Sequence, residues 1–452
     1  MTNSLRALAL FRLSLPLAAM EIPVVATVAI DTVLLGRLGA PAVAAGGLGA
    51  AVFLFVASIC VSVISSVGHE AAFRSGRRDR RGMLGVLMGG VALSCLLGCG
   101  AAVATAVVAP FLRVLGQDSV VAQHAAWYLY GVAPGFPFLL LAVCFRGMLA
   151  VQPGTARLVA VAALSVGVKA LLALAGWIWL STADVSLPSR LLMCGVTTSA
   201  TFCVMATSAW CAWRRSNLQN RVDPTSQETA TGAHRIIRRG LTIGLTTALQ
   251  TGFFTVVAIL CGRCGPADLA AHQVANQCTL LPLMFAFGMS QAAATLTSQA
   301  AGAGSPLGAR RTSWHAVGLG VVAMLMVAGV LVISGRAAIG AILPAGTPGR
   351  EHVAEIAWQL ILIGAWCQLA DGAQNIAMGA LRGLSQGSIT VRAAVIAYWL
   401  IGIPLASLLG LKCGLGATGV WMGVGVGLHV SAALLLYYLY RATYLPSDRV
   451  AT

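Results

Sequence analysis

Charged side chains are scarce in this chain of 452 residues, because Asp, Glu, Lys and Arg together make up only 9% of it. Acidic residues are rarer than basic ones, with 13 Asp and Glu against 29 Lys and Arg. A typical soluble domain carries about 25% charged residues. The scarcity of charge therefore excludes an ordinary soluble protein.

The patterns of a hydrolase or a zinc protein are also missing. No HExxH sequence occurs, and no predicted helix brings together a nucleophile, a base and a residue that orients the base. The 12 cysteines are scattered through apolar stretches, and only Cys261 and Cys264 have a recognisable spacing, without a second Cys or His pair nearby. We therefore expect no catalytic residue, no metal and no cofactor.

Apolar residues fill the chain instead, at 58% of the total, and the mean hydropathy is +0.86. A membrane-spanning helix needs about 20 mostly apolar residues. Runs of this kind lie at roughly 13–35, 42–68, 83–109, 125–149, 158–180, 190–213, 241–262, 268–297, 312–334, 355–381, 389–411 and 416–440. The sequence predicts an all-α integral membrane protein with twelve transmembrane helices.

The net charge of +16 is explained by where the basic residues lie. With the N-terminus in the cytoplasm, most Lys and Arg fall on the inner side, with clusters in "RSGRRDRRG" (74–82) and between Arg214 and Arg239. The basic excess is thus an orientation signal and not a sign of nucleic-acid binding. We predict a multi-pass protein of the cytoplasmic (inner) membrane, with both termini cytoplasmic and its first apolar run retained as a span and not cleaved as a signal peptide.

The chain divides into two similar halves. The most polar stretch, 214–240, separates six spans from six and is predicted to be a cytoplasmic linker between an N-lobe (1–213) and a C-lobe (241–452). Three pairs of segments resemble each other across it, namely "GRLGAPAVAAGGLGA" (36–50) and "GRCGPADLAAHQVAN" (262–276), "EAAFRSG" (70–76) and "QAAGAGS" (299–305), and "FRGMLAVQPGT" (145–155) and "LRGLSQGSIT" (381–390). Six spans per repeat give both halves the same orientation, which predicts two pseudo-symmetric six-helix bundles around a midplane cavity.

Two acids lie inside the first apolar run. Asp31 stands within "VATVAIDTVLLG" (25–36), where a carboxylate costs several kcal/mol and is functional by default. The alternative is an interfacial aspartate near the outer end of a tilted span. Glu21 lies ten residues earlier, about 15 Å along the helix, and is a secondary candidate for relaying protons or contacting a cationic substrate, against the alternative of a hydrogen-bonded interior acid.

A polar face is predicted on the tenth span. Asp371 has polar neighbours at i−3, i+3 and i+4, which are Gln368, Gln374 and Asn375. A polar stripe on an otherwise apolar membrane helix must turn toward protein or water. We expect this face to line a substrate cavity, the alternative being a structural network between helices.

The segments "LAAHQVANQ" (269–277), "ATLTSQAAGAG" (294–304), "IDTVLLGRLG" (30–39) and "DGAQNIAMGALRG" (371–383) resemble the MATE family of multidrug and toxic compound extrusion transporters. The resemblance implies an antiporter of the cytoplasmic membrane that exports organic compounds in exchange for protons or sodium. It assigns ion coupling to Asp31 and matches Asp371 to an acid in the tenth helix of many relatives.

The seventh span departs from the family pattern, because Gln250 stands where many relatives carry glutamate. Thr247, Gln250 and Phe254 still form one face able to contact a ligand, and Asn276, in the family-like segment, is counted with them. The missing acid puts a two-carboxylate cation site in doubt. His272 is interpreted as structural.

Lys169 lies in mid-helix, near the position where several prokaryotic relatives place an asparagine at the ion site. It has three possible states: snorkelling to an interface, pairing with Asp31, or remaining uncharged. Its depth makes snorkelling the least favoured. An ammonium beside Asp31 would repel sodium from that carboxylate, so we predict proton coupling.

We predict a secondary-active exporter that works by alternating access, as a monomer, on a small organic substrate such as a drug, a dye or a toxic metabolite. Two alternatives stay open. A flippase for lipid-linked precursors shares the repeat design but would be expected to have a strongly cationic cavity, and a sodium-coupled MATE exporter would use the same acids.

Overall fold

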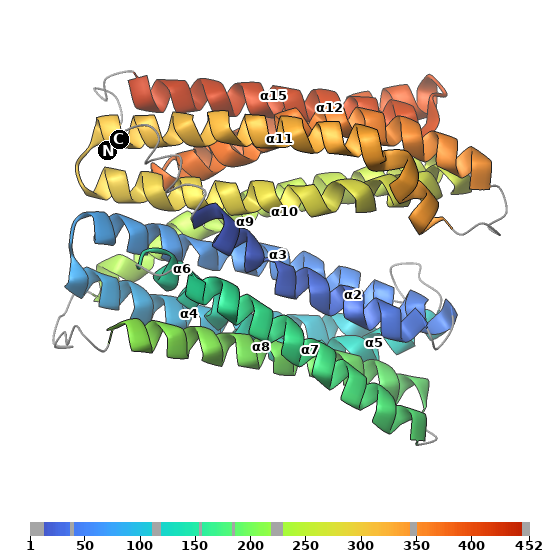
Figure 1. The fold of residues 1–452 in the computed structure, drawn as a ribbon, viewed down its shortest axis with the longest axis horizontal. Helices are drawn as coiled ribbons and strands as arrows, with labels where there is room; N and C mark the ends of the chain where they lie inside the picture. The colour runs from blue at the N-terminus through green and yellow to red at the C-terminus, as the bar shows by residue number, and fades with distance from the viewer. Residues whose placement is uncertain are drawn as a thin grey trace. The chain divides into compact units, whose positions relative to one another are not determined.

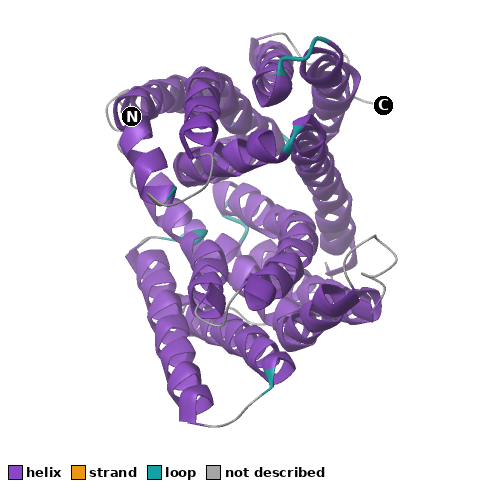
Figure 2. Ribbon diagram, turned by 90° about the vertical axis from the view of Figure 1, so that its right-hand side faces the viewer, coloured by secondary structure: helices purple, strands orange, loops and turns teal. Residues whose placement is uncertain are grey.

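The computed structural model describes residues 13–36, 40–110, 119–152, 156–182, 186–217, 229–343 and 350–444. The predicted cytoplasmic ends (1–12 and 445–452) and the middle of the predicted linker (218–228) lie outside the described residues. The described residues form helices and no strand (Figure 2). The predicted all-α class is confirmed.

Most of the helices are long enough to cross a bilayer, and shorter elements follow one another to form single spans, as in Val120–Ala150 and Gly387–Lys412. Before residue 218 they are α2 (Ile22–Gly36), α3 (Ala40–Gly76), α4 (Arg80–Val108), α5 (Ser119–Val132), the short 3₁₀ turn η2 (Ala133–Gly135), α6 (Phe136–Ala150), α7 (Ala156–Thr182) and α8 (Leu187–Asn217). After residue 228 they are α9 (Thr229–Cys264), α10 (Pro266–Gly302), α11 (Pro306–Ile342), α12 (Arg350–Gly383), α13 (Gly387–Ala394), the π-helical η3 (Val395–Gly402), α14 (Ile403–Ser407), the π-helical η4 (Leu408–Lys412) and α15 (Gly416–Tyr444).

Among the described residues, 11 helices are long and apolar enough to span a membrane. The helix pair Pro266–Thr279 and Leu283–Gly302, whose two parts differ in direction by 47°, raises the number to 12 when it is counted as one span. This agrees with the twelve spans that the sequence predicts.

The described contacts divide the chain into two compact units. One is Ala19–Gly244, here called the N-unit, and the other is Leu245–Thr452 together with Met1–Ala18, here called the C-unit. Helix α9 begins in the N-unit and continues into the C-unit after Gly244. The lobe boundaries at 213 and 241 stay a prediction, and α8 and α9 extend into both ends of the predicted linker.

The first span is interrupted shortly after the boundary between Ala18 and Ala19 that separates the two units. Residues 13–19 are helical, Met20 and Glu21 form a turn, and α2 follows. Pro23 has no N–H to donate to the carbonyl of Ala19. The sequence therefore explains the break, which ends at Glu21, two residues before this proline.

Close helix packing in the N-unit depends on glycine pairs. A methyl group built on Gly195 of α8 would lie only 2.8 Å from the Cα of Gly131 in α5, so both positions need glycine. Ser199 Oγ donates to the carbonyl oxygen of Gly131 at 2.7 Å in the same contact. This approach brings the side chains of α5 and α8 together beside α2.

The two units repeat one helix contact. In the N-unit, a methyl group on Gly147 of α6 would lie 2.7 Å from the Cα of Gly68 in α3. In the C-unit, a methyl group on Gly383 of α12 would lie 3.1 Å from Cβ of Thr297 in α10. These four residues occupy matching positions in the sequence repeat, which supports the pseudo-symmetric design.

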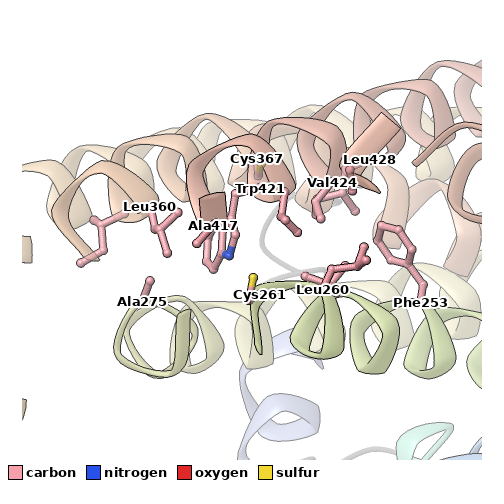
Figure 3. Close-up of a cluster of buried hydrophobic side chains, with 14 of the residues drawn as sticks. Phe253, Leu260, Cys261, Ala275, Leu360, Cys367, Ala417, Trp421, Val424 and Leu428 are labelled. Atoms are coloured by element: carbon pink, nitrogen blue, oxygen red, sulfur yellow. The ribbon is translucent and has the colours of Figure 1, made fainter. Parts of the chain in front are cut away.

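Helix α12 is the centre of the C-unit, where it packs against α10, α11 and α15, all running side by side (Figure 1). Figure 3 shows the apolar core at this place, with Trp421, Val424 and Leu428 of α15 facing Phe253 and Leu260 of α9. A polar side chain on the inner face of α12 is therefore held in an apolar setting.

Candidate ion-coupling and substrate-binding sites

The N-unit contains a buried ion pair. Lys169 of α7 and Asp31 of α2 are 0% and 3% exposed, and Lys169 Nζ lies 2.6 Å from Asp31 Oδ1. Thr198 of α8 donates to Asp31 Oδ2 at 2.9 Å, and Tyr128 of α5 donates to the same oxygen at 3.2 Å. Of the three states considered for Lys169, the structure shows the pair.

The ammonium of Lys169 is fully provided with acceptors. Besides Asp31 it lies 3.0 Å from Thr197 Oγ1, 2.9 Å from Thr198 Oγ1 and 3.5 Å from the carbonyl oxygen of Cys194. Each threonine hydroxyl in turn reaches the Cys194 carbonyl, at 2.9 Å and 3.1 Å. Four helices thus meet in one polar cluster, and buried charges persist when they are paired and hydrogen-bonded in this way.

Glu21 lies in a second ion pair of the N-unit. Its Oε1 is 2.5 Å from Arg146 Nη1 of α6, and the glutamate side chain is 22% exposed. The structure therefore does not join Glu21 to the Asp31 cluster. It places the acid at the turn before α2, held by the arginine that belongs to the repeat segment 145–155.

The C-unit contains a cavity of about 70 Å³ on the inner face of α12. Four predicted residues line it, namely Phe254, Asn276, Gln368 and Asp371. The other lining residues are Val257, His272, Thr279, Leu283, Gly364, Cys367, Trp421, Val424 and Leu428. The cavity therefore combines an acid and polar groups with two aromatic side chains.

Gln374 and Asn375 hold the acid without lining the cavity. Gln374 Nε2 donates to Asp371 Oδ1 at 2.6 Å, and Asn375 Nδ2 donates to the same oxygen at 2.9 Å. Tyr398, in the π-helical η3, donates to Gln374 Oε1 at 2.8 Å. The predicted polar face turns inward. Gln368 and Asp371 line the cavity, and Gln374 and Asn375 orient the carboxylate of Asp371.

Thr247 and Gln250 are half-buried in α9 and are not among the described residues that line this cavity. Their predicted contact with substrate stays a prediction. His272, interpreted from the sequence as structural, lines the cavity, and its Nδ1 accepts a hydrogen bond from Trp421 Nε1 at 3.0 Å. No group of three or more His, Cys, Asp or Glu in the described part of the chain is arranged to hold a metal ion.

Comparison with known proteins identifies relatives among multidrug resistance proteins. The MatE family model matches residues 16–174 and 243–408. A probable multidrug resistance protein NorM of Pseudomonas aeruginosa is 34% identical over 94% of this chain and 87% of its own length. The multidrug resistance protein NorM of Burkholderia vietnamiensis is 30% identical over 96% of this chain and 93% of its own length.

Solved structures share the fold. A MOP superfamily transporter from Pyrococcus furiosus superposes with a TM-score of 0.85 at 18% identity, covering 97% of this chain and 96% of that one. The eukaryotic MATE transporter AtDTX14 gives a TM-score of 0.82 at 19% identity with the same coverage. The chain therefore belongs to the MatE (MATE) family of membrane transporters, which are not enzymes.

Proposed function

We propose that this protein is a secondary-active antiporter that exports small organic compounds across the cytoplasmic membrane by alternating access, driven by a proton gradient. The NorM relatives are named as multidrug resistance proteins, which supports an organic cargo. The observation that carries the coupling is the buried pair of Asp31 and Lys169.

Protonation of Asp31 is the coupling step in this proposal. A proton on the carboxylate removes its charge and leaves the Lys169 ammonium with hydroxyl and carbonyl oxygens alone. A buried ammonium without its counter-ion is strongly unfavourable. Because Asp31 and Lys169 come from α2 and α7, protonation favours a different packing of these helices, and this links the proton to a change of state.

Sodium is disfavoured because the ammonium already occupies the place of a cation. A sodium ion needs several oxygen ligands at once, as other hard cations do. Asp31 Oδ1 and the hydroxyl oxygens of Thr197 and Thr198 all lie within 3.0 Å of Lys169 Nζ. A metal ion at the same oxygens would meet a positive charge at contact distance.

The cavity of the C-unit is the proposed cargo site. Asp371 supplies a negative charge, and Phe254 and Trp421 supply aromatic faces that suit a cation or a flat ring.

The protein is further proposed to act as a monomer with both termini in the cytoplasm.

The test is transport by the purified protein in liposomes, with proton and sodium gradients imposed separately and export of a fluorescent organic cation measured. Export should follow the pH gradient and not the sodium gradient. Lys169→Asn, which exchanges the ammonium for an oxygen ligand, should admit sodium as a driving ion. Equal export by the unaltered protein on sodium alone, with a proton ionophore present, would refute proton coupling.

A further inference from the structure

One buried side-chain oxygen in the C-unit has no hydrogen-bond partner among the residues that the structure describes. Gln368 is 3% exposed, and its Nε2 donates to the carbonyl oxygen of Thr279 at 3.2 Å. Because a carbonyl oxygen accepts hydrogen bonds and cannot donate them, the group that faces Thr279 is the amide nitrogen of Gln368 and not its oxygen. Gln368 Oε1 is then buried, with no hydrogen-bond donor among the described residues.

The partnerless oxygen belongs to a residue of the cavity. Gln368 and Asp371 lie one helical turn apart on α12, and both line it. Both amide donors that hold Asp371 go to Oδ1, and its Oδ2 receives no hydrogen bond from the described residues. Two residues that line the cavity, one helical turn apart, therefore each carry an acceptor that no described residue uses.

The rest of the lining defines what kind of group can enter. No Lys or Arg is among the described residues that line the cavity, so Asp371 is the charged group there. Trp421, whose side chain faces the apolar core in Figure 3, and Phe254 provide the aromatic wall. The volume of about 70 Å³ compares with roughly 10 to 15 Å³ for one water, which suits an ammonium head with a few carbon atoms.

We propose that Gln368 makes the site selective for cations that carry N–H groups, so that protonated amines bind in preference to quaternary ammonium compounds of the same shape. This inference rests on the proposed role of the C-unit cavity as the cargo site.

The physical reason is the cost of an unmade hydrogen bond. A primary ammonium can donate to Asp371 Oδ2 and to Gln368 Oε1 at once. A trimethylammonium group satisfies the charge of Asp371 but leaves the Gln368 oxygen buried and unpaired, and sites with buried polar groups reject analogues that leave those groups unpaired. Gln368 is thus a specificity-determining residue, and Asp371 supplies the attraction for any cation.

The test compares one arylalkyl scaffold with a primary ammonium and with a trimethylammonium head, both binding to the purified full-length protein in lipid nanodiscs and measured by calorimetry. The unaltered protein should prefer the primary amine. Gln368→Met should reduce that preference by about tenfold, through weaker binding of the amine and unchanged binding of the trimethylammonium compound.

Two further variants act as controls. Gln359→Met makes the same change on an exposed position of α12 and should keep the full preference. Gln368→Glu keeps an oxygen acceptor at the site and should also keep the full preference for the primary amine. This variant separates loss of the acceptor from a general effect of substitution at this position. An equal preference in the unaltered protein and Gln368→Met would overturn the inference.

The same titrations separate this inference from the proposed function. Asp371→Asn should weaken both cations strongly. If Asp371→Asn does so while Gln368→Met leaves the preference unchanged, only the selectivity role is wrong. If Asp371→Asn binds both compounds as the unaltered protein does, the cavity is not the cargo site and the inference falls with it.

Discussion

At the scale of single residues, the Asp31–Lys169 pair is the interaction on which the proposed proton coupling most depends. Its partners differ in how they can respond to loss of the other. A carboxyl group without its counter-ion can bind a proton, whereas Lys169, which is 0% exposed, would have to stay charged with only hydroxyl and carbonyl oxygens around it or lose its proton. The two single variants should therefore not be equivalent.

We predict that Asp31→Asn lowers stability by about 3–5 kcal/mol, since it leaves a buried ammonium without its counter-ion. Lys169→Met should cost less, and the double variant should regain most of the stability without regaining proton-driven export. Thermal unfolding in detergent and dye export from liposomes measure the two effects. Gradient-driven export by Asp31→Asn at the parental rate would remove Asp31 from the coupling mechanism.

The sequence identified the acids of these sites but not most of their partners. Asp31 and Asp371 are visible because a carboxylate in an apolar run is costly, and Gln374 and Asn375 because they share a helical face with Asp371. Tyr128, Thr198 and Trp421 come from other helices and are residue types that a membrane helix tolerates without a special role. Only tertiary contacts bring them to the acids, so helical periodicity could not indicate them.

At the scale of helices, the glycine contact between α5 and α8 sets the position of two side chains that donate hydrogen bonds to Asp31. Tyr128 precedes Gly131 by one turn, and Thr198 follows Gly195 by one turn. Backbone atoms of α5 lie on the other side of Gly195, so a larger residue cannot be accommodated by a side-chain rotation alone. The helices themselves would have to separate.

Gly195→Ala should therefore destabilise the protein by about 1–3 kcal/mol, the usual cost of overpacking, and should reduce export by displacing Tyr128 and Thr198. Thermal unfolding and liposome transport measure both results. Gly167→Ala in α7 is the matched control, because nothing lies within 4 Å of the added methyl group, and it should leave both unchanged. Equal behaviour of the two variants would show that the contact is not tight.

The start of α4 shows how a loop acid stabilises a helix end. Asp79 is the N-cap and accepts from the Gly82 N–H at 2.8 Å, and it pairs with Arg74 at 2.6 Å. Partial burial alone would raise the pKa of Asp79, but the bonds from Arg74 and Gly82 outweigh it and hold the pKa below its ordinary value of 3.8. The stabilisation is therefore complete above that value and is lost as the pH falls through the lowered pKa.

Asp79→Ala should cost about 1 kcal/mol at neutral pH through loss of the cap. Asp79→Asn keeps a good capping group and removes only the charge, so it should cost less and should flatten the loss of stability below about pH 4. Unfolding curves recorded at several pH values measure both. A pH dependence in Asp79→Asn that matches the parent would mean that another acid causes it.

At the scale of the whole molecule, the number of spans decides on which side of the membrane each end lies. The apolar runs predicted the spans because burial in lipid requires long uninterrupted helices. The sequence did not predict that α9 would begin in one compact unit and end in the other, since hydropathy carries no information about which helices pack together. The sequence predicted one span at 268–297, whereas the structure divides this helix into two parts that differ in direction by 47°.

The sides of the membrane on which the two chain ends lie should show whether α10 counts as one span. With the pair as one span the chain crosses the membrane 12 times and both ends lie on one side, whereas 11 crossings would place them on opposite sides. Because the basic clusters at 74–82 and 214–239 favour the cytoplasm, a fluorescent reporter fused at either end should fluoresce inside the cell. A phosphatase fused at either end should be inactive, and one inserted between α7 and α8 should be active. Phosphatase activity at the C-terminus, with the N-terminus still inside, would show an odd number of crossings and would place α10 outside the set of spans.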